Sequence, residues 1–222
     1  MRKISYVIAF LALAVAIVLN IFSTFRNDWV TVKSTSDILH TSVTDFYGLR
    51  QTCRLTLTEI PEPGGNGHGK VTYRNYECRP FPASVTDECE DKNRGFCASW
   101  TGAAYVEYVS IGFAAVALVA ILFGMTTHSR RVRIWKALAG LALAQTLSQV
   151  VAFALVTDTY HRNKYPGFDH GRLGIAWAFS LLSWITSALV AFGVVVTGIA
   201  ADKGYNWAVG NRDRGLYERI RD

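Results

Sequence analysis

The sequence predicts an all-α membrane protein, a four-helix bundle, that carries a small extracellular antiparallel β-sheet domain. Two observations predict this fold class: four long apolar stretches alternate with charged segments, and all four cysteines lie between the first two stretches. Half of the 222 residues are hydrophobic and 18% are charged, whereas average globular chains carry about 25% charged residues. The composition therefore indicates a membrane protein before any motif is considered.

Each of the four apolar stretches is long enough to cross a bilayer as a helix, since a hydrocarbon core of about 30 Å needs about 20 residues. We expect transmembrane helices at residues 4–22, 102–125, 134–156 and 174–201. The first stretch follows a basic start, so a cleaved signal peptide is the alternative. Its apolar run exceeds the usual length of roughly 7–15 residues, and no clear small-x-small cleavage site follows it, which favours a retained helix.

The short segments set the expected orientation, because Lys and Arg in short loops favour the cytoplasmic side. The N-terminus (1–3), the connection 126–133 and the tail 202–222 must share a side, and all three are basic. We therefore expect a multi-pass plasma-membrane protein with both termini in the cytoplasm and two extracellular loops, 23–101 and 157–173. The net charge of +6 mostly reflects this topology, and the basic residues form no single patch, so no nucleic-acid partner is expected.

The cysteines support the same orientation, because Cys53, Cys78, Cys89 and Cys97 all fall in the predicted first extracellular loop. An even set on the exoplasmic side is typical of disulfides. A zinc site is the alternative, but the first loop has neither the Cys-x-x-Cys spacing nor the paired histidines that would support one. Two disulfides permit three pairings, and proximity along the chain favours 53–78 with 89–97.

Residues 53–60 and 71–78 predict a β-hairpin within the first loop. Both segments alternate in polarity and are rich in Thr, Leu, Val and Tyr, while residues 61–69 between them are dense in Gly and Pro. We expect a long, mobile tip at this turn-forming segment. Cys53 and Cys78 would then lie near the open end of the hairpin, within reach of each other.

The third helix carries a stripe of small residues that recurs every four positions: Gly140, Ala144, Ser148 and Ala152. Such a stripe allows close approach of helix backbones. Packing within the bundle is the favoured interpretation, and a lateral self-association face is the alternative. We expect interhelical hydrogen bonds from the polar side chains of Asn20, Gln145 and Gln149. In the fourth helix the same small-residue spacing recurs at Ser183, Ser187 and Ala191.

No convergent acid, base or nucleophile is evident, so neither an enzyme nor a cofactor is predicted. Glu107 is the only ionisable residue inside a predicted span before its cytoplasmic border. We expect a structural placement for it, interfacial or paired, with a partner contact as the alternative and catalysis as the third. Four residues of the second loop could bind a divalent metal: Asp158, His161, Asp169 and His170. Acids and histidines in loops are more often solvated, so no metal site is predicted.

Aromatic residues gather near both ends of the predicted spans. We interpret them as belts at the membrane–water interface, where amphipathic rings are enriched. The outer belt has two groups and the inner belt one residue: Tyr47, Trp100, Tyr105 and Tyr108, then Tyr160, Tyr165 and Trp177, and finally Trp135.

One pattern in the first loop resembles a known signature. Trp29, the pair Gly48-Leu49, Cys53 and Cys78 are similar to the Trp…Gly-Leu-Trp…Cys…Cys motif of the claudin and peripheral-myelin-protein superfamily. The four helices and the long-then-short loops match that tetraspan family as well. The resemblance implies a left-handed four-helix bundle capped by a small antiparallel sheet. Arg50 replaces the usual second Trp, and the long gap between the two cysteines looks more like divergent fungal and invertebrate relatives.

The expected function is non-enzymatic: association through the extracellular loops that organises a membrane domain, an adhesion contact or a cell junction. The partners would be membrane lipids and either like molecules or another membrane protein. An auxiliary subunit of a channel or transporter is the alternative that the resemblance also permits. A membrane-embedded enzyme is the third, and it lacks a convergent polar site.

Overall fold

A computed structural model describes residues 3–36, 41–61, 70–126 and 128–205. Over these residues it contains four long helices and a five-stranded antiparallel sheet. The chain divides into two compact units. The first, called the helical unit below, comprises residues 1–21, 106–150 and 181–222; the second, the sheet unit, comprises residues 22–105 and 151–180.

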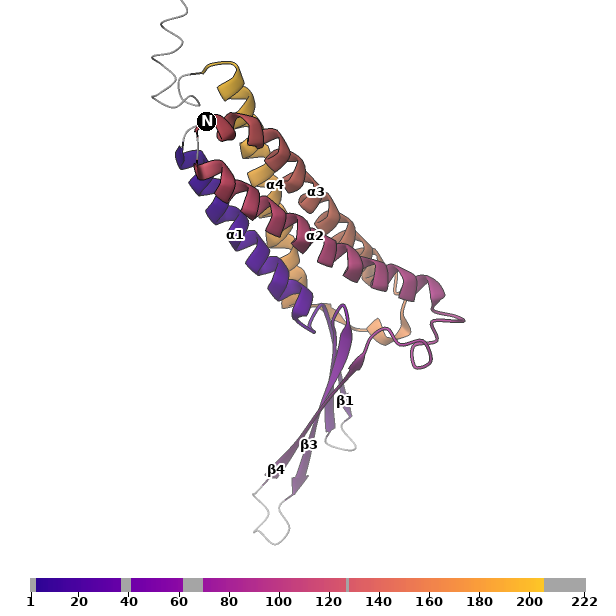
Figure 1. The fold of residues 1–222 in the computed structure, drawn as a ribbon. Coiled ribbons are helices and arrows are strands. Elements are labelled where there is room, and N and C mark those ends of the chain that lie inside the picture. Colours follow the sequence, from indigo (N-terminus) through magenta and orange to yellow (C-terminus); the bar gives the residue numbers. More distant parts are fainter. Residues whose placement is uncertain (1–2, 37–40, 62–69, 127, 206–222) are drawn as a thin grey trace, which may run out of the picture. The chain divides into compact units, whose positions relative to one another are not determined.

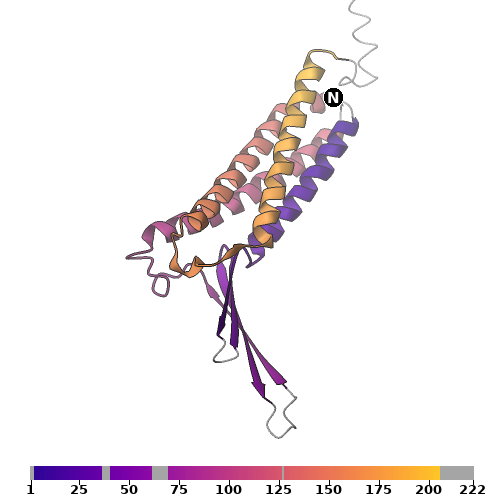
Figure 2. The ribbon, with the colours of Figure 1, turned by 180° about the vertical axis from the view of Figure 1, so that it is seen from behind.

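The helices are α1 (Lys3–Phe25), α2 (Arg94–Thr126), α3 (His128–His161) and α4 (Ile175–Asp202). Within the helical unit they run alongside one another as a bundle (Figure 1), and the view from behind shows the same arrangement (Figure 2). All four are long and apolar enough to cross a membrane by length and composition. This finding indicates a multi-pass membrane protein.

Each predicted apolar stretch lies within or almost within one helix, but two helices extend well beyond the predicted spans. α2 already begins at Arg94, and α3 includes residues 128–133, predicted to be a loop, and continues to His161. Hydropathy marks only the apolar part of a helix, whereas a helix continues until its hydrogen bonding is capped. Asn163 has the left-handed φ of 46° that commonly follows a helix end, and Pro166 comes shortly after it.

The helical unit has a core of small and branched apolar side chains. Leu13, Ile121 and Leu138 are at most 1% exposed and belong to one buried cluster. Alanines fill many of the remaining buried positions, which allows the backbones to approach closely. The buried alanines of this unit are Ala9, Ala16, Ala114, Ala117, Ala139, Ala142, Ala191 and Ala200.

Polar side chains connect the helices inside this core, as the sequence predicted. The side-chain amide of Asn20 in α1 donates to Ser110 Oγ in α2 at 2.6 Å. Gln145 in α3 donates to Ser187 Oγ in α4 at 2.9 Å. All four residues are completely buried. The prediction of interhelical hydrogen bonds is therefore confirmed for Asn20 and Gln145.

Gln149 takes part in a second interhelical connection. Its amide N–H donates to Ser183 Oγ at 2.8 Å, and the Ser183 hydroxyl donates in turn to the Ala16 carbonyl oxygen at 2.8 Å. Because the serine hydrogen is already used, the glutamine must present its N–H to the serine. Its Oε1 atom is then buried without a hydrogen-bond partner.

Replacing Gln149 with Met should therefore change the free energy of unfolding by less than about 1 kcal/mol, although a buried hydrogen bond is lost. The substitution removes the unsatisfied carbonyl together with the bond, and interhelical bonds in membranes average about 0.6 kcal/mol. Ser183→Ala should cost about 1–2 kcal/mol, because it leaves the Gln149 N–H without its acceptor. Reversible unfolding of the full chain in mixed detergent would measure both, and a larger loss for Gln149→Met would contradict the prediction.

The small-residue stripe of α3 does not lie in the interior along its whole length. Ala152 is buried and both Ala144 and Ser148 are half-buried, but Gly140 is exposed, and a Cβ atom there would meet nothing within 4 Å. Packing within the bundle, the favoured interpretation, is therefore wrong for Gly140. The buried face of α3 runs instead through positions such as Leu138, Ala142, Gln145 and Gln149.

The sheet has the strand order β4-β3-β2-β1-β5, and every neighbouring pair is antiparallel. The strands are β1 (Val30–Ser36), β2 (Thr41–Tyr47), β3 (Gln51–Pro61), β4 (Lys70–Pro80) and β5 (Arg172–Leu173). β3 and β4 pair along their whole length with Cys53 opposite Cys78, which confirms the predicted hairpin. Its predicted mobile tip, residues 62–69, lies outside the described residues.

The turn between β2 and β3 depends on a glycine. The Gly48 N–H donates to the Gln51 carbonyl at 2.9 Å. A Cβ atom at position 48 would lie 2.8 Å from Asn27 Cα and about as close to two backbone oxygens. Backbone cannot move aside as a flexible side chain can, so only glycine fits here. This requirement gives Gly48 of the signature a physical reason.

Candidate functional site

The other signature residues lie at the base of the sheet and hold it together. Trp29 is completely buried, and its indole N–H donates to the Ser23 carbonyl at 2.8 Å. Leu49 is 1% exposed. Cys53 and Cys78 form a disulfide between β3 and β4, with 4.1 Å between their Cα atoms. These residues stabilise the sheet unit and present no reactive group.

A second disulfide joins Cys89 to Cys97 across a short connection, with Cα atoms 5.6 Å apart. Both bonds thus follow the pairing that proximity along the chain favoured. The described part of the chain has no free cysteine. Since each thiol is oxidised in a bond, none is available as a nucleophile or a metal ligand.

Six aromatic rings pack together beside the base of the sheet and are called the aromatic cluster below. Trp100 in α2 is completely buried, and its ring centre lies 5.3–5.7 Å from those of Phe81, Phe96 and Phe168. The full cluster consists of Tyr47, Phe81, Phe96, Trp100, Tyr165 and Phe168. The interpretation as interfacial belt residues is therefore wrong for Tyr47, Trp100 and Tyr165, which form a protein core.

A carboxylate lies buried next to this cluster. Asp87 is 2% exposed and accepts two hydrogen bonds from the Arg79 guanidinium at 2.7 and 2.8 Å. The Tyr165 hydroxyl donates to Asp87 Oδ1 at 2.8 Å, and the backbone N–H of Ala83 donates to Oδ2 at 2.7 Å. Asp87 therefore connects β4 with the segment before α4, although Tyr165 lies 78 positions further along the chain.

The charges in this network are matched. Burial alone would raise the pKa of Asp87, but the hydrogen bonds from Arg79, Ala83 and Tyr165 outweigh burial and hold this pKa below its ordinary value. The same contact with Asp87 raises the pKa of Arg79. Burial, followed by the hydrogen bond to Asp87, raises the pKa of the Tyr165 hydroxyl. These directions keep Asp87 and Arg79 charged and Tyr165 neutral near neutral pH, which agrees with a stabilising role of the network.

The acids and histidines of the second loop do not come together as a metal site. Asp158 pairs instead with Arg162 and Lys164, both at 2.6 Å. Among the residues that the structure describes, no group of three or more His, Cys, Asp and Glu side chains could hold a metal ion.

Glu107 is completely buried in the helical unit. The partner contact that the sequence leaves open for Glu107 stays a prediction. Of the predicted placements, the paired structural one agrees best with this burial.

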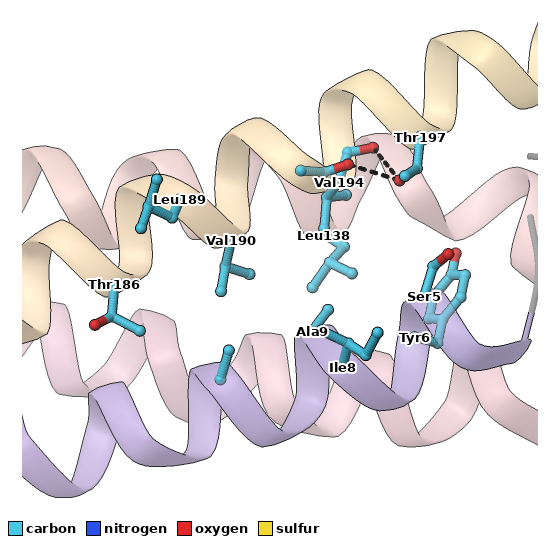
Figure 3. Close-up of a pocket in the computed structure, with 12 residues that line it drawn as sticks. Ser5, Tyr6, Ile8, Ala9, Leu138, Thr186, Leu189, Val190, Val194 and Thr197 are labelled. Carbon is cyan, nitrogen blue, oxygen red and sulfur yellow. Dashed lines mark hydrogen bonds between the residues drawn. The ribbon is translucent and has the colours of Figure 1, made fainter.

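An apolar hollow of about 370 Å³ lies in the helical unit between α1 and α4 (Figure 3). Ala9, Val190 and Leu138 surround its middle, Ser5 and Tyr6 lie at one end, and Thr186 lies at the other. No charged residue is among the twelve that line it. The mostly apolar lining therefore suits an apolar group.

The sheet has two distinct faces because successive strand residues point to opposite sides. The register places Phe46, Cys53, Leu55, Tyr76 and Cys78 on one side, called the cysteine face below. On the opposite side, Asp45 and Arg54 form a bidentate cross-strand pair at 2.7 and 3.2 Å. This pair is more exposed than the Arg79–Asp87 pair, since the Arg54 side chain is 64% exposed.

Strand β4 forms one edge of the sheet, and within the described residues no strand covers it. All residues from Thr72 to Cys78 are exposed, including Tyr73 at 65% and Tyr76 at 57%. The Cα distance of 4.1 Å between Cys53 and Cys78 is typical of a non-hydrogen-bonded antiparallel pair. The backbone N–H and C=O of Cys78 therefore point away from β3, toward the open edge.

The same backbone orientation recurs at every second residue of β4. Thr72, Arg74 and Tyr76 share it with Cys78, because the register with β3 continues without a break. At these four alternate positions the edge offers backbone donors and acceptors that no described strand pairs, flanked by exposed tyrosines. Such an edge is a template for pairing with another strand.

Fold and site together define a multi-pass membrane protein with a disulfide-bonded antiparallel sheet, in which β4 is an edge strand that no other described strand covers. No protein-family model matches the chain, and no curated protein matches it significantly.

Proposed function

We propose that this protein is a non-enzymatic component of membrane contacts, which associates through its extracellular sheet to organise an adhesion site, a junction or a membrane domain. The open edge of β4 is the observation that carries this proposal. Natural sheets usually protect their edges with charges, bulges, prolines or covering segments. Arg74 and Glu77 place charges beside this edge, but no bulge, proline or covering strand interrupts Thr72–Cys78 in the described structure, so its backbone groups can still pair with another strand.

A second copy of the chain is the partner that the β4 sequence fits best. In an antiparallel pair related by two-fold symmetry, residues of equal parity face each other across the edge. Pairing centred on Asn75 places Tyr73 opposite Glu77 of the second copy. No like charges oppose each other in this register among residues 72–78, and the edge-facing backbone groups of Arg74 and Tyr76 bond reciprocally.

The rigid base of the sheet supports the same proposal. The Cys53–Cys78 bond, the aromatic cluster and the Arg79–Asp87 pair fix the end of the hairpin from which β4 projects. A preorganised strand loses less conformational entropy on pairing than a flexible one. The resemblance of the Trp29, Gly48-Leu49 and Cys53 signature to the claudin superfamily, a family of membrane contact proteins, adds to this support.

Asn75→Cys should produce a disulfide-linked dimer in native membranes at about twice the monomer mass of 24.6 kDa. The side chains at position 75 of two copies would face each other in a non-hydrogen-bonded pair, where Cα atoms lie about 4.5 Å apart, within disulfide reach. Mild oxidation followed by non-reducing electrophoresis measures the product. The native cysteines do not interfere, because both pairs are already bonded.

Thr56→Cys is the matched control. Thr56 lies directly opposite Asn75 on β3, on the same face but one strand further from the edge. In the proposed pair, the two copies of position 56 would be three strand spacings apart, about 14 Å, too far for a disulfide. Equal dimer from both variants would contradict edge pairing. A single adduct of Asn75→Cys with a different protein would instead favour the auxiliary-subunit function.

A further inference from the structure

A hollow of about 670 Å³ lies on the cysteine face of the sheet unit. Its walls come from the residues that end and follow α1, from Leu55 on β3, and from Arg74 and Tyr76 on β4. All residues that line the hollow belong to the described part of the chain. It is separate from the β4 edge, because side chains on the face of the sheet form it, whereas the edge is formed by backbone groups.

The hollow carries one uncompensated positive charge. Arg26 and Asp28 neutralise each other through a bidentate pair at 2.8 and 2.7 Å. Arg74 is exposed and, within the described part of the chain, has neither an ion pair nor a side-chain hydrogen bond. A free guanidinium with five donors is suited to a phosphate or a carboxylate.

One wall of the hollow is apolar and continues along a helix. Phe25 is 62% exposed and lines the hollow, and Phe22, one helical turn earlier in α1, is 56% exposed. Both lie on one face of a helix that is apolar and long enough to cross a membrane. The ligand that matches this arrangement has an apolar chain beside Phe22 and Phe25 and an anionic group beside Arg74.

We propose that this hollow binds the headgroup of an anionic phospholipid, whose phosphate or carboxylate pairs with Arg74 while an acyl chain lies on Phe22 and Phe25. An acidic peptide would satisfy Arg74 but would leave the apolar continuation along α1 unexplained, so the lipid is the better match. The inference goes beyond the proposed function and does not depend on it, because a monomer with an uncovered β4 edge has the same hollow.

Native mass spectrometry of the purified full chain tests the proposal, with phosphatidylserine and phosphatidylcholine offered in turn. The wild-type protein should bind phosphatidylserine in preference, and Arg74→Gln should weaken that preference about tenfold, since one charge-assisted contact is commonly worth that factor. Phe25→Ser should weaken binding of the same lipid without altering charge. Inorganic phosphate alone should not compete, because it lacks the acyl chain.

Lys33→Gln is the matched control, since Lys33 is an exposed cation on the cysteine face but does not line the hollow. It should leave the lipid preference unchanged. The proposal is overturned if the wild type shows no preference, if Lys33→Gln and Arg74→Gln act equally, or if the wild type binds an acidic peptide in preference to phosphatidylserine and Arg74→Gln removes that preference. Hydrogen exchange of the strand amides confirms that each variant is folded. Dimer formation by Asn75→Cys is a separate measurement, so failure of either proposal can be recognised on its own.

Discussion

Replacing Arg79 with Met should lower the local unfolding free energy of the sheet unit by about 3 kcal/mol at neutral pH. Breaking a buried ion pair from one side leaves the other charge without compensation, which commonly costs 3–5 kcal/mol. The lower end of that range applies because the Arg79 side chain is 39% exposed, although that of Asp87 is fully buried. Methionine preserves the apolar length of the chain that lies over Phe81, so the loss reports the charge.

The difference between the variant and the wild type should shrink as the pH falls. In the wild type the folded pKa of Asp87 is lowered, so its stabilisation is present above about pH 4 and is lost as the pH falls through the folded pKa. Without Arg79, burial raises the pKa of this carboxyl relative to the wild type, and protonation then costs the variant less. Hydrogen exchange of the β3 and β4 amides between pH 7 and pH 3 measures both effects.

Arg54→Met provides the matched control. Arg54 also forms a bidentate pair with an aspartate of the sheet unit, but its own side chain is 64% exposed and that of Asp45 is 18% exposed. Exposed pairs contribute at most about 1 kcal/mol. Equal losses from Arg79→Met and Arg54→Met would show that the burial of Asp87 has no special role in holding the sheet.

The helices and the central hairpin could be predicted because their signals are local. Apolar length marks a membrane helix, and alternation around a Gly- and Pro-rich segment marks a hairpin. The interhelical bonds of Asn20 and Gln145 could be predicted for a similar reason, since a polar side chain inside an apolar helix needs a partner. None of these inferences requires knowledge of a distant contact.

The buried carboxylate could not be predicted, because its role depends on distant partners. Asp87 belongs to an acidic segment, and nothing in the sequence separates it from Glu88, which is exposed. Its partners lie 8 and 78 positions away. The open edge of β4 was missed for a related reason: strand order, which decides whether a strand lies at an edge, is a property of the whole sheet.

Spacing on a helix predicts which residues share a face, but not which face is buried. Gly140 and Ser148 share a face as predicted, yet the buried face of α3 lies beside theirs and includes Gln145 and Gln149. The same uncertainty affected the aromatic residues of α2. Trp100 and Tyr105 are close in sequence, but the first is completely buried and the second is 69% exposed.

We expect Trp100→Ala to destabilise the sheet unit strongly. Deleting a fully buried tryptophan costs about 3–5 kcal/mol, from lost burial and from the cavity that remains. Trp100 contacts three rings of the aromatic cluster, and its indole N–H donates to the Gly48 carbonyl at 3.1 Å. We therefore expect a loss of about 4 kcal/mol in the local unfolding free energy of the sheet unit.

Two further substitutions divide this effect into its parts. Trp100→Phe keeps most of the ring packing but leaves the Gly48 carbonyl without its donor, so it should cost about 1–2 kcal/mol. Tyr105→Ala removes an exposed aromatic from the same helix and should change stability by less than about 0.5 kcal/mol. Hydrogen exchange of the strand amides, with helix content followed by circular dichroism, measures all three. If Tyr105→Ala were as costly as Trp100→Ala, the aromatic cluster would not be the core that holds the hairpin, and the preorganised edge on which the proposed association rests would lose its support.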